Sequence, residues 1–147
     1  MDPVKAFEEE RKVEIEKMGK DDSFRLLSRK WLEYSVPQKY SYNFRWMGRP
    51  VIQYPQDLIA LQEIIWDTKP DLIVETGIAH GGSLIFHASL LELIGGDGQI
   101  VGVDVDIRAH NKREIEKHPM YKRINMIEGS SVDKEIVAQV FKKAENK

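Results

Sequence analysis

The stretch Val74-Glu75-Thr76-Gly77-Ile78-Ala79-His80-Gly81-Gly82-Ser83 decides the fold of this 147-residue chain. It follows a short, mostly apolar segment at residues 71–74 and precedes an amphipathic segment at residues 84–94. That order predicts a strand, a glycine-rich turn and a helix. Glycine lets the backbone adopt positive φ and approach a ligand closely, and the helix that follows presents unpaired N–H groups and its positive dipole end. The stretch therefore predicts a site for a nucleotide-like cofactor.

The spacing of the glycines separates two classes of cofactor. A dinucleotide site has the pattern G-x-G-x-x-G directly after the strand, whereas this chain has E-x-G-x-x-x-G-G-S. A ligand with one nucleoside and a charged amino-acid end, such as S-adenosylmethionine, suits this pattern better, because acceptors around the turn can meet its ammonium group. A nicotinamide-dependent oxidoreductase is accordingly disfavoured. The residues expected to bind the cofactor here are Glu75, Gly77, Ala79, His80, Gly81, Gly82 and Ser83.

Two later strand ends carry suitable polar side chains. Asp104 ends the predicted strand at residues 99–104, where its carboxylate can accept hydrogen bonds from both ribose hydroxyls. Ser131 follows the next strand, and we expect it on the adenine side. Asp106 is expected to cap the helix that begins near Arg108. The carboxyl ends of parallel strands share one edge of the sheet, where ligands bind.

The fold class that these segments predict is α/β, a Rossmann-like partial parallel sheet of about three strands preceded by N-terminal helices. We expect two parts, a helical extension at residues 1–40 and a cofactor-binding domain at residues 41–147. The predicted strands are residues 71–76, 99–104 and 123–128, and the predicted helices are residues 2–19, 24–36, 55–67, 82–94, 108–117 and 132–143. Strand 71–76 would be an edge carrying Leu72, Ile73 and Val74, and an open apolar edge predicts self-association unless the N-terminal helices cover it.

An aromatic segment lies between the two parts. Tyr42, Phe44 and Trp46 alternate, which predicts a short strand with one apolar face, followed by a turn at residues 47–50. Core packing is the main expectation for these rings. Residues 52–54, before the third helix, are expected near the amino-acid end of the cofactor.

The histidines and Ser83 have more than one interpretation. His80 either contacts the cofactor or substrate with its ring or contributes only a backbone N–H. We expect His87 to be a satisfied, partly buried residue, and His110 and His118 to face solvent. Ser83 starts a helix, so its hydroxyl is expected to act as a cap. No spacing matches a helical metal site, and we expect no metal bound by this chain alone.

Composition excludes several classes of protein. Apolar residues make up 41% and charged residues 31%, which is typical of a globular domain. A net charge of −2 gives no electrostatic footprint for nucleic acid. The absence of cysteine excludes disulfides and fits a reducing compartment. No apolar run has the length of a membrane span, and no signal peptide is recognisable, so the expected location is the cytoplasm.

From Tyr40 to about Ala144 the sequence resembles the cephalosporin hydroxylase family, which includes rhamnosyl O-methyltransferases. The resemblance rests on five runs: residues 42–50, 53–57, 75–83, 102–108 and 128–131. It implies a class I methyltransferase fold that uses S-adenosylmethionine, with a sugar, glycolipid or small natural product as methyl acceptor.

The resemblance also indicates what the chain lacks. A class I methyltransferase sheet has about seven strands, and this chain supplies three, so we expect it to be truncated after the third. Family resemblance places the Mg²⁺ ligands and the catalytic base beyond Lys147, and the catalytic residues are unknown here. The leading hypothesis is the cofactor-binding portion of an O-methyltransferase. The alternative is a non-catalytic remnant or interaction module in which the fold survives without chemistry.

Overall fold

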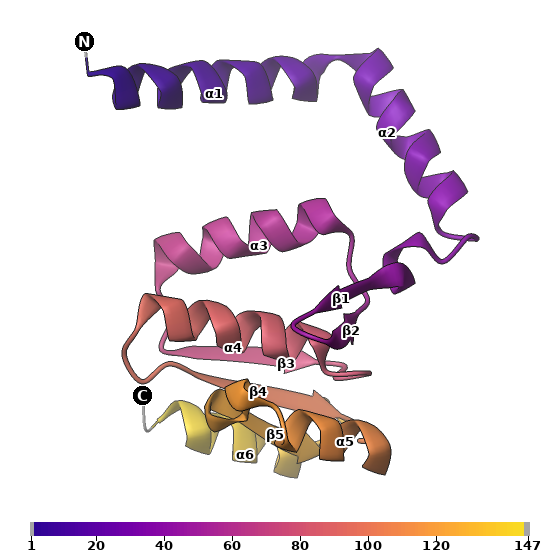
Figure 1. Cartoon of the computed structure of the whole chain (residues 1–147), viewed down its shortest axis with the longest axis vertical. Coiled ribbons are helices and arrows are strands. Elements are labelled where there is room, and N and C mark those ends of the chain that lie inside the picture. Colours follow the sequence, from indigo (N-terminus) through magenta and orange to yellow (C-terminus); the bar gives the residue numbers. More distant parts are fainter. Residues whose placement is uncertain (1, 146–147) are drawn as a thin grey trace. The chain divides into compact units, whose positions relative to one another are not determined.

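The computed structural model describes residues 2–145, which divide into two compact units between Tyr40 and Ser41. Figure 1 shows both units, and each is described here by itself. No helix of the described residues is long and apolar enough to cross a membrane.

The first unit consists of two helices, α1 (Pro3–Lys20) and α2 (Asp22–Ser35). Asp21 separates them, and its carboxylate accepts hydrogen bonds from the N–H groups of Ser23 (2.8 Å) and Phe24 (3.0 Å). Asp21 is therefore the N-cap and satisfies two of the free N–H donors of α2. α1 buries no residue within the chain.

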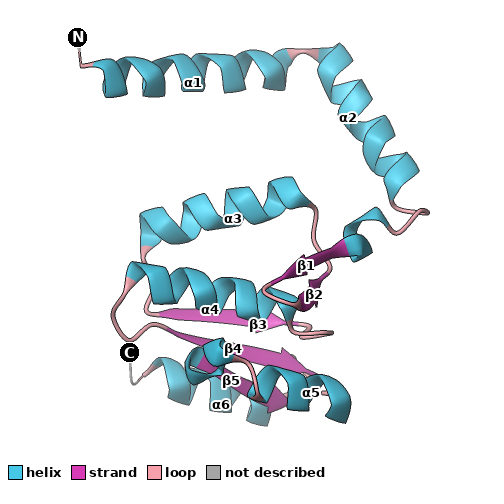
Figure 2. Ribbon diagram, in the orientation of Figure 1, coloured by secondary structure: helices cyan, strands magenta, loops and turns pink. Residues whose placement is uncertain are grey.

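The second unit is built on a parallel sheet in the order β3-β4-β5 (Figure 2). The strands are β3 (Leu72–Thr76), β4 (Gln99–Asp104) and β5 (Ile124–Glu128). The register pairs Glu75 with Gly102 and Asp104 with Glu128, so the carboxyl ends of all three strands meet at one edge. The α/β Rossmann-like fold predicted from the sequence is confirmed.

α4 (Gly82–Ile94) is the central helix of this unit. Leu84, Ile85, Ala88 and Leu91 join a core with Ile100 of β4, while Phe86 packs in a second cluster with Val51 and Leu58. A helix that buries apolar residues on both sides lies inside the domain. Two elements supply the second side: a hairpin of β1 (Phe44–Trp46) and β2 (Arg49–Val51), and α3 (Pro55–Thr68).

Two further helices complete the unit, α5 (Ala109–Glu116) and α6 (Lys134–Ala144). Gly102 faces α4, since a Cβ there would lie 3.0 Å from Leu84. Val74 and Val103 lie on the other face of the sheet from Gly102. There they line a small hollow with α6 residues such as Ile136. The glycine-rich turn therefore lies between a buried helix and the carboxyl edge of the sheet.

The observed elements agree closely with the predicted ones, with two corrections before the sheet. Tyr42 lies in a 3₁₀ turn, η1 (Tyr40–Asn43), and not in a strand. The predicted turn at residues 47–50 is shorter, because Met47 (φ 44°) and Gly48 (φ 86°) alone form it. Two central residues with positive φ make the hairpin turn that matches strand twist. Arg49 and Pro50 consequently lie in β2, which the sequence analysis missed.

Arg123 fixes the connection between α4 and β4. It ends the 3₁₀ segment η2 (Pro119–Arg123), and only 9% of it is exposed. Its guanidinium donates to the carbonyl oxygens of Gly98 (2.9 Å) and Gly96 (3.1 Å) and to the Glu92 carboxylate (2.6 Å). Hydrogen bonds from Lys122 and Arg123 hold the pKa of Glu92 below its usual range.

Candidate functional site

The turn between β3 and α4 has an irregular backbone that only some residues can adopt. Gly77, Ala79 and Gly81 all have positive φ, at 89°, 47° and 78°. The Gly77 N–H donates to the carbonyl of Val103 (2.8 Å), and the Gly81 N–H donates to that of Ile78 (2.8 Å). The first bond holds the turn against the end of β4, and the second closes the turn on itself.

The three glycines of the turn are required for different reasons. A Cβ on Gly81 would lie 2.3 Å from the Ile115 side chain, and one on Gly82 would lie 2.0 Å from the Pro50 carbonyl oxygen. Close packing against α5 and β2 therefore explains these two glycines. Around Gly77 no atom lies within 4 Å of the Cβ position. The positive φ and the open space leave Gly77 as the glycine beside which a ligand can approach.

Glu75 is held by two side chains of α4. Its Oε1 accepts a hydrogen bond from the Ser83 hydroxyl, and its Oε2 lies 3.1 Å from His87 Nδ1. The Glu75 and His87 side chains are only 15% and 10% exposed. Ser83 does not cap α4, whose N-cap is Gly81 without a side-chain bond, so the predicted cap is wrong. The reason is that Glu75 offers a stronger acceptor within reach. His87 has a hydrogen-bond partner, as expected, but it is buried and not partly buried.

Asp104 joins the end of β4 to the glycine-rich turn. Its Oδ2 accepts from the N–H groups of Ile78 (2.7 Å) and Ala79 (3.2 Å), and its Oδ1 accepts from Asp106 (3.1 Å). Burial favours the neutral acid and works to raise the pKa of Asp104. Backbone hydrogen bonds, including that of Val105, outweigh burial, so the pKa lies below its usual value. The carboxylate is therefore held ionised.

Arg49 and Asn111 support the turn from outside, and the sequence analysis named neither. The Arg49 guanidinium donates to the His80 carbonyl from Nε (3.0 Å) and Nη2 (2.6 Å), and to Asn111 Oδ1 (3.1 Å). Asn111 Nδ2 donates to the Ala79 carbonyl (2.9 Å), and its Oδ1 lies 3.4 Å from His80 Nδ1. Both residues fall within or beside runs that carried the family resemblance, but no local spacing indicated their contact.

Other predicted residues lie apart from this cluster. Ser131 is exposed and lines the hollow beside Val74 and Thr76, whose side chains point to the sheet face opposite Glu75. Asp106 does not cap α5, because the N-cap is Arg108, without a side-chain bond. Its own N–H instead turns back to Asp104.

Two histidines lie outside the turn. His110 is exposed, as expected. His118 is half-buried, so the expectation that it faces solvent is wrong. Its Nε2 donates to the Met47 carbonyl (3.0 Å), and its Nδ1 accepts from the Met120 N–H (3.2 Å). This ring joins the β1–β2 hairpin to η2 and has no polar atom left for a ligand.

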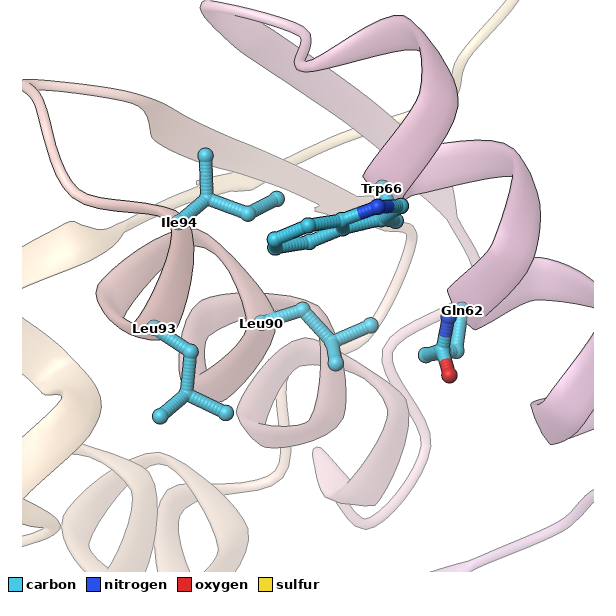
Figure 3. A pocket seen from close by; sticks show the side chains of 5 residues that line it. All are labelled: Gln62, Trp66, Leu90, Leu93 and Ile94. Atoms are coloured by element: carbon cyan, nitrogen blue, oxygen red, sulfur yellow. The ribbon is translucent and has the colours of Figure 1, made fainter. Parts of the chain in front are cut away.

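A separate hollow of about 410 Å³ lies between α3 and α4 (Figure 3). Its lining residues are Gln62, Trp66, Leu90, Leu93 and Ile94. Gln62 and Trp66 belong to α3, and the other three belong to the C-terminal half of α4, whereas the glycine-rich turn precedes the N-terminus of α4. Apart from the Gln62 amide and the Trp66 indole nitrogen, these lining side chains are apolar. Within residues 2–145 no group of three metal-ligating side chains comes together.

The glycine-rich turn at the carboxyl edge of a Rossmann-like sheet is the candidate site, and comparison with known proteins identifies the family. The sequence profile of the Rhamnosyl O-methyltransferase/CmcI family matches residues 38–147. The chain therefore belongs to this family. This confirms the resemblance found in the sequence.

Individual relatives agree with this assignment. Rhamnosyl O-methyltransferase of Mycobacterium leprae (strain TN) is 33% identical over 60 residues, covering 41% of this chain and 26% of that protein. Its counterpart in Mycobacterium bovis (strain BCG / Pasteur 1173P2) is 28% identical over 95 residues, covering 65% of this chain. The match spans only 37% of that relative.

Solved structures show the same fold. An apo structure of CmcI is 23% identical with a TM-score of 0.54, and covers 67% of this chain and 40% of that one. A CmcI structure with Mg and SAM is 24% identical with a TM-score of 0.53, and covers 66% of this chain and 40% of that one. At these identities the similarity concerns the fold alone.

Proposed function

We propose that this chain is the cofactor-binding portion of an S-adenosylmethionine-dependent O-methyltransferase. The observation that carries the proposal is a pair of carboxylates, Glu75 and Asp104, at the ends of two adjacent strands beside the glycine-rich turn. The turn has open space at Gly77, and the chain belongs to the Rhamnosyl O-methyltransferase/CmcI family. When bound, the cofactor supplies an activated methyl group. The methyl acceptor would be a hydroxyl of a sugar, a glycolipid or a small natural product.

The hydrogen-bond acceptors of the site fit the two polar ends of this cofactor, its ammonium group and its ribose hydroxyls. An ionised carboxylate offers about four acceptor positions. Glu75 uses two of them for Ser83 and His87, which leaves acceptors for an ammonium group. Asp104 already accepts three backbone hydrogen bonds. Two ribose hydroxyls would therefore have to share its oxygens with the N–H groups of Ala79 and Asp106, which make the longer bonds, or replace those bonds. Holding the donor in one orientation is the main contribution of such residues to methyl transfer.

The roles of the other predicted residues follow from their positions. The positive φ angles of Gly77, Ala79 and Gly81 give the turn the shape against which the cofactor would lie. Gly82 is the first residue of α4, the helix that follows the turn. Ser131 remains our candidate for the adenine side. Mg²⁺, expected for the family, would be held by residues outside this set, because the described residues bring no three ligands together.

A binding experiment tests this proposal. We expect S-adenosylhomocysteine to bind the chain saturably in a calorimetric titration, and Asp104→Ala to weaken the binding at least about tenfold, since hydrogen bonds to a charged group are lost. Asp106→Ala is the matched control, because its carboxylate is exposed and its N–H stays in place. It should bind like the wild type.

The competing functions give different results in the same experiment. A nicotinamide-dependent protein would bind NAD and not S-adenosylhomocysteine. A non-catalytic remnant would bind neither, although circular dichroism would show it folded. Either result would contradict the proposal.

We also infer that the isolated chain self-associates through the free side of β3. In the described residues β3 pairs only with β4, and Val74 is 48% exposed. An open strand with apolar side chains favours pairing with a second copy. Light scattering should show a dimer for the wild type and a monomer for Val74→Lys, while Leu93→Lys, on exposed α4 surface, should stay dimeric. A monodisperse wild-type monomer would refute the inference.

A further inference from the structure

The structure assigns His87 of α4 a role that nothing in the glycine-rich pattern indicates: we propose that it is a positioning residue for the cofactor's amino-acid end. Given the proposed function, His87 would set the orientation of the Glu75 carboxylate. His87 lies 12 residues beyond Glu75 in the sequence, outside the turn itself.

The contact between the two side chains indicates which ring nitrogen of His87 is the donor. His87 Nδ1 lies 3.1 Å from Glu75 Oε2, and an ionised carboxylate can only accept. The ring therefore donates from Nδ1. Both side chains are largely buried, at 10% and 15% exposure, so water competes little for this hydrogen bond. The bond is directional and holds the carboxylate plane.

Ser83 completes the arrangement from the other side. Its hydroxyl donates to Oε1, so each carboxylate oxygen of Glu75 has one donor from α4. Two donors on two oxygens leave one orientation of the carboxylate, and the remaining acceptor positions have a fixed direction. A carboxylate that is already oriented loses less conformational freedom when an ammonium group arrives.

α4 itself holds His87 firmly. The flanking residues Phe86 and Ala88 are about 1% and 0% exposed, and the Phe86 ring centre lies 5.3 Å from that of His87. Packing on both sides fixes the backbone from which the imidazole projects. A positioning residue needs this kind of support.

Two ligands distinguish binding at the amino-acid end of the cofactor from binding at its nucleoside end. 5′-Methylthioadenosine keeps the nucleoside and the sulfur but has no amino-acid group. If His87 acts through Glu75 on the ammonium group, its loss should weaken S-adenosylhomocysteine and leave 5′-methylthioadenosine unaffected. A general loss of structure would weaken both ligands.

The test compares His87→Leu, which removes the donor, with His87→Asn, whose amide nitrogen takes the place of Nδ1. We expect His87→Leu to raise the Kd for S-adenosylhomocysteine about tenfold, with no change in the Kd for 5′-methylthioadenosine measured by ligand-observed NMR. His87→Asn should restore most of the affinity. His110→Leu, on the exposed side of α5, is the matched control and should bind like the wild type.

Adding Glu75→Gln gives a second readout. Because His87 acts through Glu75, the double variant with His87→Leu should bind S-adenosylhomocysteine no more weakly than Glu75→Gln alone. Three results would overturn the inference: unchanged binding by His87→Leu, equal loss of both ligands, or a His87→Asn variant as weak as His87→Leu. If the wild type binds no S-adenosylhomocysteine at all, the proposed function itself fails, which is a different result.

Discussion

Gly82→Ala should destabilise the second unit by at least about 3 kcal/mol. The added Cβ would lie 2.0 Å from the Pro50 carbonyl oxygen, 2.5 Å from its carbon and 2.7 Å from the Val51 Cα. All three atoms belong to the backbone, so no side-chain rotation can relieve the overlap. Either β2 moves away from α4 or the helix shifts, and both changes open the cluster of Val51, Leu58 and Phe86.

Urea unfolding followed by far-UV circular dichroism measures this effect. Near-UV circular dichroism should also change, because Trp46 packs edge-on against Phe86 at 4.9 Å in the same cluster. Gly77→Ala is the comparison: its Cβ meets no atom within 4 Å, so only the positive φ is strained, at about 1–2 kcal/mol. Equal effects of the two substitutions would show that the Pro50 contact is not what requires glycine.

Arg49→Ala should lower the free energy of unfolding by about 2–3 kcal/mol, the value of hydrogen bonds to a charged group in a partly buried site. Its guanidinium donates twice to the His80 carbonyl and once to Asn111. Without it, both acceptors lose their charged partner and the glycine-rich turn loses its support from β2. Arg49→Lys should recover little, since an ammonium group cannot reproduce the planar fork.

Arg45→Ala provides the control for this prediction. Arg45 lies on β1 of the same hairpin and is exposed, so its substitution should change stability by no more than about 0.5 kcal/mol. Urea unfolding gives the stabilities, and amide hydrogen exchange of the turn, residues 77–81, should quicken in the Arg49 variants only. Unchanged hydrogen exchange in Arg49→Ala would mean that the turn keeps its shape without the Arg49 hydrogen bonds.

Much of the fold could be predicted because its elements depend on local patterns. The predicted helix at residues 82–94 and strand at residues 99–104 coincide with α4 and β4. Apolar runs bounded by glycine mark both elements regardless of what packs on them. The other elements of the sheet differ from prediction by one or two residues at their ends, where local signals compete.

The details of the site could not be predicted, because they depend on contacts between distant segments. Arg49 meets His80 across 31 residues, and His118 meets Met47 across 71. The glycines show the same limit. The pattern correctly indicated a turn, but it could not reveal that Gly82 is required by Pro50 and Gly81 by Ile115, whereas Gly77 has open space.

The Arg123 contacts decide how the α4–β4 connection would respond to protein engineering. Residues 95–98 read Gly-Gly-Asp-Gly, a composition that usually marks a permissive place for an inserted tag or a new chain terminus. Here the carbonyls of Gly96 and Gly98 are both bound by a buried guanidinium. An insertion would deprive that cation of both carbonyl acceptors and leave it only the Glu92 carboxylate. The tip of the β1–β2 hairpin is no substitute, because the Met47 carbonyl accepts from His118.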